Sequence, residues 1–382
     1  MTLTMKAAVL RETALPKPYV ESAPLQIEDV TLDPPQPLEL LVKIGGAGLC
    51  HSDLSVINGA LGRGVPLVLG HEGAGEVVEV GSAVTDIKPG DPVIFQFSPS
   101  CGRCRMCLSG RPQICEEVLK TRADGSLISG GTRLKDADGK ALRHHAGLSC
   151  MAEYAVVNRG SVVKIDSDVP LSKAALFGCA VMTGVGAVIN TAQVRPGQSV
   201  AIFGLGGVGL CGIMGAKVAG AETIIAVDFE DHKLAKAMDL GATHAFNAKD
   251  PDLTEKIMDL THGGVEFGLD LAGAIPALKS AYAATARGGK VITAGISPIG
   301  SEFSFPQPDL VLNEKSVCGS FMGSCAPVRD IPRYLALWKQ GLLPVDKLID
   351  RVIPFETLNE GFDRLDDGSA LRQVLDPHMA AA

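Results

Sequence analysis

Hydrophobic and polar positions divide the 382-residue chain into regions with different patterns. Up to about residue 180, short apolar runs such as 38–44 and 75–81 alternate with turns rich in Pro and Gly, which is typical of short β-strands. Residues 119–147 are polar and Gly-rich, with few periodic apolar positions, and predict a long surface loop. The sequence therefore predicts a β-rich first region that contains one long surface loop.

From about residue 181 to residue 322 the pattern changes to buried strands that alternate with helices. This alternation predicts a parallel sheet with helices on both faces. After residue 323 we expect a helix around Trp338, a short strand and a last helix. The expected strands are 199–203, 223–228, 243–246, 265–271, 290–294 and 351–355, and the expected helices include 208–218, 233–240 and 358–365.

The composition narrows the class of protein. Hydrophobic residues make up 46% and charged residues 20% of the chain, and its length suits two domains better than one core. The net charge of −8 argues against a nucleic-acid or anionic membrane partner, because either would need a basic face. No apolar run approaches the ~20 residues that span a bilayer, and the N-terminus lacks a signal-peptide pattern, so we expect a cytoplasmic protein.

Four cysteines form a local cluster with the spacing C-x2-C-x2-C-x7-C. Four thiolates at such short spacing can close tetrahedrally around one zinc ion. The alternative is a redox pair with two incidental cysteines. Because a four-cysteine site leaves no open position for a substrate, the spacing predicts a structural zinc ion, held by Cys101, Cys104, Cys107 and Cys115.

A second set of metal-ligating residue types is dispersed along the chain, as Cys50, His71 and Cys179. A catalytic zinc ion needs three protein ligands and one open position, and two thiolates with one imidazole form a known set. Each element alone is weak evidence, since a histidine beside a glutamate, as in His71-Glu72, is more often an ordinary hydrogen-bonded residue. The residues alone leave both interpretations open.

A glycine-rich turn, Gly204-Leu205-Gly206-Gly207-Val208-Gly209, follows the strand expected at 199–203. It opens a helix, and the acidic residue Asp228 ends the next strand, which is the context of a dinucleotide-binding fingerprint rather than of a merely structural turn. Glycines let the backbone approach a pyrophosphate at the helix N-terminus. A carboxylate at 228 would bind a ribose 2′-hydroxyl and repel a 2′-phosphate, which favours NAD over NADP.

Taken in order, these motifs resemble those of the zinc-dependent medium-chain alcohol dehydrogenases over essentially the whole chain. The resemblance implies an α/β protein in which a Rossmann doubly wound parallel sheet (181–322) is joined to a β-rich GroES-like catalytic domain (1–180 and 323–382). It implies two zinc ions per chain, with the dispersed set holding the catalytic one and Glu72 just behind it. It also implies contacts to NAD from His51, Gly204, Gly206, Gly207, Val208, Gly209, Asp228, Lys233, Ile296 and Arg372.

Two positions depart from the family pattern. His51 stands where family members often have an arginine that faces the pyrophosphate, and Ser55 stands where a histidine forms the last station of a proton relay. Ser52 matches the hydroxyl that takes the proton of the alcohol. We therefore expect Ser52, Glu72 and His51 to serve catalysis. The residue that would pass the proton on to solvent is not identified.

The resemblance predicts reversible, NAD-linked oxidation of primary or secondary alcohols to aldehydes or ketones. Zinc would lower the pKa of the alcohol, Ser52 would accept its proton, and the nicotinamide would accept the hydride. The residues that the resemblance places in the pocket, Ser52, Leu61, Phe97 and Ile296, are mostly apolar and favour alkyl or aromatic alcohols. They do not identify one substrate.

Three alternatives differ from this prediction in particular residues. S-(hydroxymethyl)glutathione (formaldehyde) dehydrogenases of the same family have an acidic residue where this chain has Leu61. Polyol dehydrogenases usually have a carboxylate in place of Cys179. A non-catalytic NAD-binding protein on the same scaffold would be expected to lack zinc ligands or the Ser52 hydroxyl.

The resemblance also implies a homodimer, because family members with a long loop at the position of 119–147 are commonly dimers. The last strand of the parallel sheet, near 316–320, would then pair across a two-fold axis. We expect His144 and His145, at the end of the loop, to be solvated, and the alternative is that one of them lines the mouth of the pocket. The remaining cysteines are expected to be small buried residues: Cys150, Cys211, Cys318 and Cys325.

Overall fold

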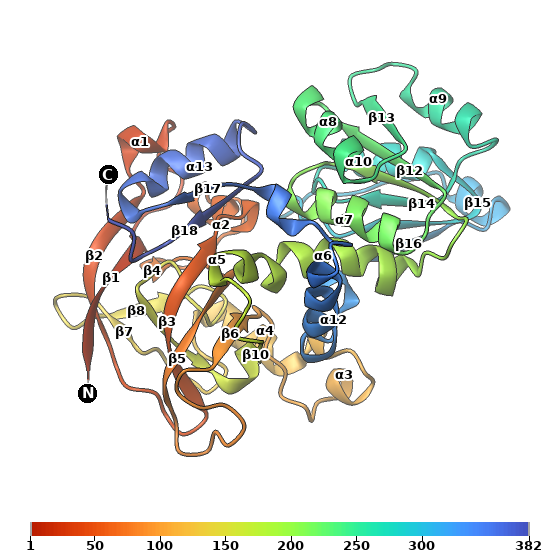
Figure 1. Ribbon diagram of the computed structural model, residues 1–382. Coiled ribbons are helices and arrows are strands. Elements are labelled where there is room, and N and C mark those ends of the chain that lie inside the picture. The colour runs from red at the N-terminus through yellow and green to blue at the C-terminus, as the bar shows by residue number, and fades with distance from the viewer. Residues whose placement is uncertain (1, 381–382) are drawn as a thin grey trace. The chain divides into compact units, whose positions relative to one another are not determined.

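The computed structural model describes residues 2–380, which form two compact units (Figure 1). The first unit contains the chain up to Cys179, together with Ala326–Pro332 and the residues from Ile349 onward. The second unit contains Ala180–Cys325 and Arg333–Leu348. Residues 333–348, which the sequence analysis assigned to the first domain, thus pack with the second unit.

The first unit is rich in β-structure, and its strands form a closed barrel and a seven-stranded sheet. The barrel has the order β1-β2-β7-β8-β4, and the sheet has the order β10-β6-β5-β3-β18-β17 with β9 also paired to β3. Their bounds are β1 Leu3–Leu10, β2 Leu25–Leu32, β3 Glu39–Gly48, β4 Leu67–Val68, β5 Gly73–Val80, β6 Pro92–Phe95, β7 Leu134–Lys135, β8 Ala141–His144, β9 Tyr154–Asn158, β10 Val162–Lys164, β17 Ile349–Ile353 and β18 Arg372–Leu375.

Short helices connect these strands. Strand β3 is the centre of the sheet, because it pairs with β5, β9 and β18, and its alternate residues Leu40, Val42 and Ile44 are fully buried in the core. The helices are α1 Tyr19–Ser22, α2 His51–Ile57, α3 Arg105–Leu108, α4 Glu116–Asp124, α5 Leu171–Ala174 and α13 Leu358–Asp366.

The prediction of one long surface loop over 119–147 is wrong. This segment contains the end of α4 and both strands β7 and β8, which pair with each other and, respectively, with β2 and β4 of the barrel. Leu127, Leu134 and Leu142 are buried in the core of the barrel. Three apolar side chains at irregular spacing therefore fix a segment whose composition is otherwise that of a loop.

The second unit contains a six-stranded sheet in which every neighbouring pair is parallel, as the sequence predicts. Its order, β13-β12-β11-β14-β15-β16, is the strand order 3-2-1-4-5-6 of a Rossmann fold, with a switch point between β11 and β14. The bounds are β11 Ser199–Phe203, β12 Thr223–Asp228, β13 His244–Asn247, β14 Val265–Asp270, β15 Thr285–Thr293 and β16 Ser316–Gly319.

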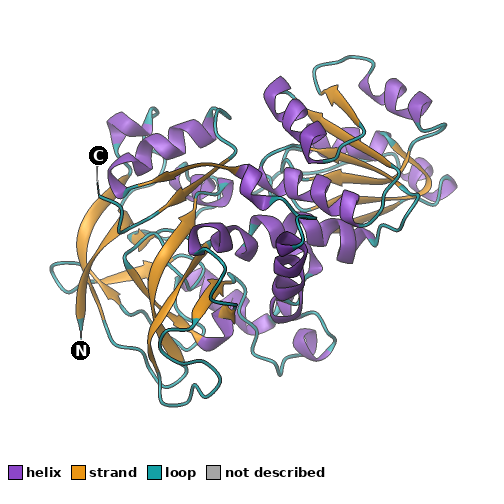
Figure 2. Ribbon diagram, in the orientation of Figure 1, coloured by secondary structure: helices purple, strands orange, loops and turns teal. Residues whose placement is uncertain are grey.

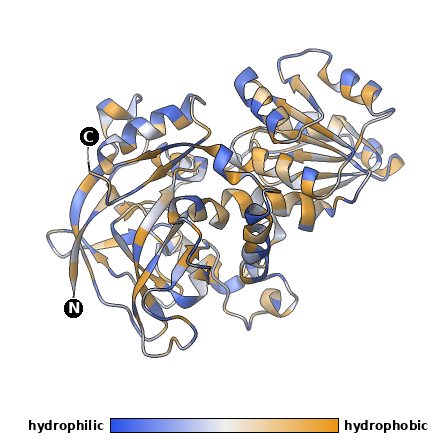
Figure 3. Cartoon of the chain, viewed as in Figure 1, coloured by the Kyte–Doolittle hydropathy of each residue, from blue (hydrophilic) through white to orange (hydrophobic). Residues whose placement is uncertain are grey.

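Helices cover both faces of this sheet (Figure 2). Phe203 and Val227 face the helices α9 and α10, whereas Ile202 faces α7. In Figure 3 the outer helices α8 and α9 carry both hydrophobic and hydrophilic segments, as helices with one buried face should. The helices of the second unit are α6 Ala180–Gly186, α7 Gly207–Val218, α8 Asp231–Leu240, α9 Leu253–Leu260, α10 Ile275–Ala283 and α11 Gln307–Leu312. Helix α12 Pro327–Lys339 begins in the first unit and ends in the second.

Strand β16 lies at the edge of the parallel sheet, where β15 is its only partner among the described strands. Helix α11, which precedes β16, exposes Val311 and Leu312. Across the described residues, no single helix has the length and apolar composition to cross a membrane. The segments Leu171–Gly178 and Ala180–Ala192 together have that length and composition, but the chain bends by 47° between them.

Candidate functional site

Cys50 begins helix α2 and is fixed by the first turn of that helix. It is the N-cap residue, and its backbone N–H donates to Asp53 Oδ2 at 3.2 Å, while the backbone N–H of Asp53 in turn donates to the Cys50 side chain. This reciprocal arrangement is a capping box, which orients the side chain of the first residue. Cys50 is 6% exposed and Asp53 is fully buried.

His71 follows the short strand β4. Cys179 comes directly after the helical turn Ala175–Gly178, which continues from α5. Cys179 Sγ lies 3.5 Å from His71 Nε2. The ligand atoms of Cys50, His71 and Cys179 all lie within 4.8 Å of one another, and all three residues are buried. The structure thus brings together three residues that are far apart in the sequence.

This set fits a zinc ion by its chemistry. Two sulfurs and one imidazole nitrogen are ligands that zinc prefers, and three protein ligands are the number found in catalytic sites. His71 Nδ1 donates to Asp53 Oδ1 at 2.9 Å. That hydrogen bond fixes the tautomer that leaves Nε2 with a lone pair for a metal ion.

Glu72 and Arg372 form a buried charged pair behind the three ligands. Arg372 Nη1 lies 3.4 Å from Glu72 Oε2 and donates to the Leu49 carbonyl oxygen at 2.9 Å. Burial raises the pKa of Glu72 to about 7, and the charge of Arg372 opposes this shift. A side chain at Gly48 would come within 2.4 Å of the Glu72 carboxylate, so Gly48 leaves room for that carboxylate in its present position.

The four-cysteine cluster forms a second candidate metal site. Cys104 Sγ lies 3.5 Å from Cys107 Sγ and 3.9 Å from Cys115 Sγ. Sulfurs around a tetrahedral zinc ion at ~2.3 Å are about 3.8 Å apart, whereas a disulfide would need about 2 Å. Backbone N–H groups lower the pKa of Cys104 to about 6, which favours the thiolate that binds metal. All four side chains, Cys101, Cys104, Cys107 and Cys115, lie within 4.8 Å of one another.

The glycine-rich turn joins β11 to α7, as predicted. A side chain at Gly204 or at Gly209 would collide with the protein itself, so these two glycines serve close packing. A side chain at Gly206, the N-cap of α7, would meet no protein atom within 4 Å. Space beside a helix N-terminus that has no side chain is suited to a phosphate group. The turn therefore fits a dinucleotide.

Asp228 ends β12 and is tied to this turn. Its Oδ2 accepts from the backbone N–H of Leu205 at 2.6 Å, and its Oδ1 accepts from that of Glu230 at 3.1 Å. The carboxylate thus stands beside the turn at the carboxyl end of the sheet. The other predicted cofactor residues lie at the start of α7 (Gly207 and the half-buried Val208), in α8 (Lys233, half-buried) and after β15 (Ile296, 61% exposed).

The remaining predicted site residues lie around the first turn of α2. His51 is exposed, and Ser52 and Ser55 are half-buried. Phe97, a predicted pocket residue, places its ring against that of His71 with the centroids 5.5 Å apart. Phe97 and Leu61 are both partly buried and pack against the core of the first unit.

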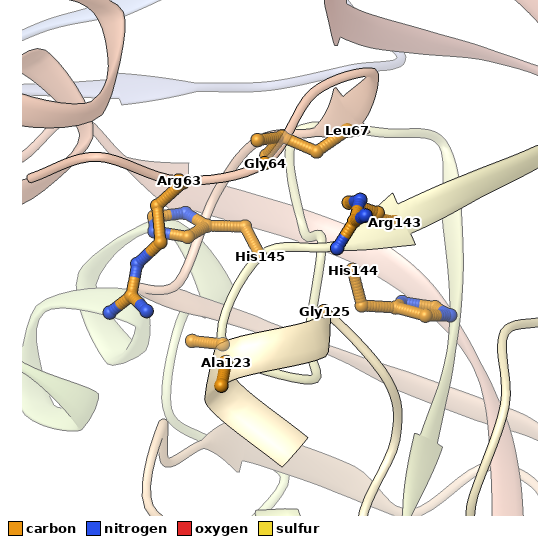
Figure 4. A pocket seen from close by; sticks show the side chains of 9 residues that line it. Arg63, Gly64, Leu67, Ala123, Gly125, Arg143, His144 and His145 are labelled. Atoms are coloured by element: carbon orange, nitrogen blue, oxygen red, sulfur yellow. The ribbon is translucent and has the colours of Figure 1, made fainter. Parts of the chain in front are cut away.

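The prediction that His144 and His145 are solvated is wrong, because both are buried. Strand β8 ends at His144, and the pairing of β8 with β4 carries both histidines into the interior. They border a cavity of about 20 Å³, enough for roughly one water molecule (Figure 4). Figure 4 shows the His145 ring beside Arg63 and the His144 ring on the opposite side.

Sequence reasoning also gave no role to Asp53 or Asp270. In the sequence, Asp53 is distinguished only as the last residue of the motif Cys50-His51-Ser52-Asp53. Asp270 ends β14, and its carboxylate accepts from the backbone N–H groups of Ala272 and Gly273 and from Thr293 Oγ1. An acidic residue at the end of a predicted parallel strand is the signal that could have indicated this loop anchor. Of the four cysteines outside the metal clusters, only Cys318 is not fully buried.

The sequence matches two known protein domains. Residues 36–167 match the alcohol dehydrogenase GroES-like domain, and residues 207–340 match the zinc-binding dehydrogenase domain. These matches cover β3 to β10 of the first unit and most of the second unit.

Solved structures agree with these matches over nearly the whole chain. An alcohol dehydrogenase zinc-binding domain protein from Burkholderia ambifaria is 35% identical, with a TM-score of 0.93 over 99% of this chain and 100% of that one. Benzyl alcohol dehydrogenase from Acinetobacter calcoaceticus is 32% identical, with a TM-score of 0.91 over 98% and 99%. A zinc-binding dehydrogenase from Sinorhizobium meliloti bound to NADP is 27% identical, with a TM-score of 0.79 over 98% and 100%. The chain therefore belongs to the zinc-dependent alcohol dehydrogenases of the medium-chain dehydrogenase family.

Proposed function

We propose that this oxidoreductase is an NAD-dependent alcohol dehydrogenase that holds two zinc ions per chain. The proposal rests chiefly on one observation, the convergence of Cys50, His71 and Cys179 at a buried place next to a hydrogen-bonded carboxylate. Three ligands of this kind leave one position for a substrate, whereas the four-cysteine cluster leaves none. The first site would therefore be catalytic and the second structural.

Zinc at the first site supplies a Lewis acid that lowers the pKa of an alcohol, and NAD supplies the two-electron oxidant. The residues of the chain position these groups and move the proton. Ser52, two residues after the ligand Cys50, would accept the proton of the alcohol through its hydroxyl. Asp53 holds His71 in the tautomer that binds metal, and the exposed His51 would face the pyrophosphate. Arg372 would contact the pyrophosphate as well.

NAD is the proposed cofactor because of Asp228. Its carboxylate stands beside the turn that would hold the pyrophosphate, so it could accept from a ribose 2′-hydroxyl but would repel a 2′-phosphate. The relative from Sinorhizobium meliloti was solved with NADP, so both cofactors belong in the assay.

The proposed substrates are primary or secondary alcohols with an alkyl or aromatic body. Phe97 beside His71 supplies an apolar wall, and Leu61 supplies no charge that could bind a polar glutathione adduct. The likeness to a benzyl alcohol dehydrogenase supports an aromatic alcohol as the first to be tested.

We also propose a homodimer. One of the two arguments for a dimer was the predicted long loop, and that prediction is wrong. The other argument is the open edge of the parallel sheet. Strand β16 has an open edge, and the neighbouring Val311 and Leu312 are 57% and 73% exposed. Pairing two such edges across a two-fold axis would cover both the open strand and these apolar side chains.

Metal analysis and kinetics test the catalytic proposal together. The purified protein should contain two zinc ions per chain and should oxidise ethanol or benzyl alcohol with NAD in preference to hydroxymethylglutathione. Cys179→Ala should lose one zinc ion and all turnover while its thermal unfolding stays cooperative. One zinc ion or none in the wild type would contradict the proposal, as would hydroxymethylglutathione as the best substrate.

A further inference from the structure

The carboxylate of Asp53 is surrounded by several hydrogen-bond donors. The Cys50 N–H donates to Oδ2 at 3.2 Å, and His71 Nδ1 donates to Oδ1 at 2.9 Å. Asp53 thereby contacts the backbone of one proposed zinc ligand and the ring of another. Because Asp53 is fully buried, the position of its charge depends on the donors around it.

His145 supplies a further contact to the same oxygen. Its Nδ1 lies 3.1 Å from Asp53 Oδ1, and its ring meets that of His71 edge-on, with the centroids 5.3 Å apart. The ring is only 7% exposed, and among the described residues Nδ1 makes no hydrogen bond of good geometry, so Asp53 Oδ1 at 3.1 Å is the polar atom placed to accept from it. The Nδ1–H of His145 points less directly at Asp53 Oδ1 than the Nδ1–H of His71 does, so the contact of His145 is the weaker of the two.

The arrangement is a shared carboxylate rather than another metal site. Ligand atoms of Asp53, His71 and His145 do lie close enough together to hold a metal ion. However, the 2.9 Å contact between His71 and Asp53 has the length of a hydrogen bond, and His71 Nε2 is directed to Cys179. Because a carboxylate only accepts, both histidines must present a protonated Nδ1 to it.

We propose that His145 is a positioning residue of the catalytic metal site, acting through Asp53. Its Nδ1–H holds Oδ1 where the carboxylate can orient His71, and it links the zinc ligands in α2 and after β4 to the end of barrel strand β8. The inference rests on the proposed catalytic zinc site. It assigns a role to a histidine that is neither a ligand nor a group in contact with the reacting atoms.

Two variants separate the hydrogen bond from the ring. His145→Phe keeps a ring against His71 but removes the donor, whereas His145→Asn removes the ring and keeps an amide N–H near the position of Nδ1. The measurement is the affinity of the metal-free catalytic site for Zn²⁺, by competition with a chromophoric chelator. His145→Phe should bind Zn²⁺ roughly 10- to 100-fold more weakly, as is usual when a partner of a zinc-bound histidine is lost. His145→Asn should stay within about threefold of the wild type.

A spectroscopic readout and two controls complete the experiment. Co²⁺ at the catalytic site should give a d–d spectrum that is shifted in His145→Phe and restored in His145→Asn. His144→Phe is the matched control, since His144 accepts from the Arg133 N–H and does not contact Asp53, and it should leave the Zn²⁺ affinity unchanged. A cooperative thermal unfolding transition at the temperature of the wild type reports that each variant is folded.

The double variant tests the route through Asp53. In an Asp53→Asn background, His145→Phe should have little further effect on Zn²⁺ affinity, because the two changes interrupt the same contact. Equal affinities for wild type and His145→Phe, equal losses for Phe and Asn, or additive losses with Asp53→Asn would each overturn the inference. These results are distinct from a wild type that lacks the second zinc ion, which would overturn the proposed zinc site and the inference with it.

Discussion

In the proposed function, the preference for NAD over NADP depends on a single carboxylate, that of Asp228. We expect NAD to exceed NADP in kcat/KM by at least about tenfold, since the carboxylate and a 2′-phosphate would repel each other. Asp228→Asn removes the charge and keeps an oxygen that can accept from the Leu205 N–H, so it should narrow the ratio without loosening the turn. Asp228→Gly should narrow it further. Equal use of both cofactors by the wild type would refute this assignment.

The next prediction concerns the exposed His51, at the position where relatives often carry arginine. Histidine side chains titrate near ~6.5, whereas arginine stays charged at any working pH. If His51 faces the pyrophosphate, NAD affinity should weaken as the pH rises through the titration of the imidazole. His51→Arg should abolish that dependence. The measurement is the cofactor dissociation constant from pH 5.5 to 8.5, and parallel curves for the two proteins would exclude the contact.

His144 should make the folded state sensitive to acid. Burial, with the nearby charge of Arg133, lowers the pKa of His144 to about 3. Below pH ~6.5 the unfolded chain binds a proton at this residue that the folded chain does not, so the free energy of unfolding falls by up to about 1.4 kcal/mol per pH unit. His144→Gln keeps an acceptor for the Arg133 N–H and should lose roughly 1 kcal/mol less between pH 6.5 and 5.5. Chemical denaturation at both pH values measures the difference.

At the scale of elements, the segment from Cys101 to Cys115 should depend on its metal. Helix α3 has four residues and buries none of them, so side-chain packing contributes little to its stability. Cys107→Ser should therefore lower the thermal stability and increase proteolysis within this segment, because structural zinc binding is coupled to folding. Ser109→Ala, on the exposed end of the same helix, is the control. Unchanged zinc content in Cys107→Ser would contradict a four-cysteine site.

Elements with strong local signals could be predicted from the sequence. The expected strands 199–203 and 223–228 match β11 and β12 residue for residue, because each is a run of apolar residues buried on both faces of a parallel sheet. Strands β7 and β8 were missed for the opposite reason. They have two and four residues, and they are stabilised by pairing with β2 and β4, which are distant in the sequence.

The candidate site, too, could be predicted where a local motif marks its residues and could not where distant segments meet. The proposed zinc ligands could be named because cysteine and histidine in known motifs suggest metal binding. The contact between Asp53 and His145 could not, because it depends on the register of β8 against β4, which the sequence does not reveal. The burial of a histidine in a polar stretch is decided by its strand partners.

At the scale of the whole molecule, the proposed dimer can be tested on its apolar surface. Leu312→Glu, beside the open edge of β16, should convert a dimer to a monomer, because a charge would be buried in the interface. Leu108→Glu is the matched control, since Leu108 is 75% exposed but belongs to the four-cysteine segment. Sedimentation equilibrium distinguishes the states. A wild-type monomer or tetramer, or dissociation by Leu108→Glu, would count against pairing through β16.

The two candidate metal sites differ in how much of the chain must be ordered before each can bind a metal ion. Cys101 and Cys115 are 14 residues apart, whereas His71 and Cys179 are 108 apart. Closing the longer loop costs more conformational entropy, and its ends meet only when the strands between them have paired. A nascent chain could therefore capture zinc at the local cluster early in folding. Occupation of the dispersed site would instead mark a first unit that has finished folding, so a half-folded chain could carry metal but could not act on an alcohol.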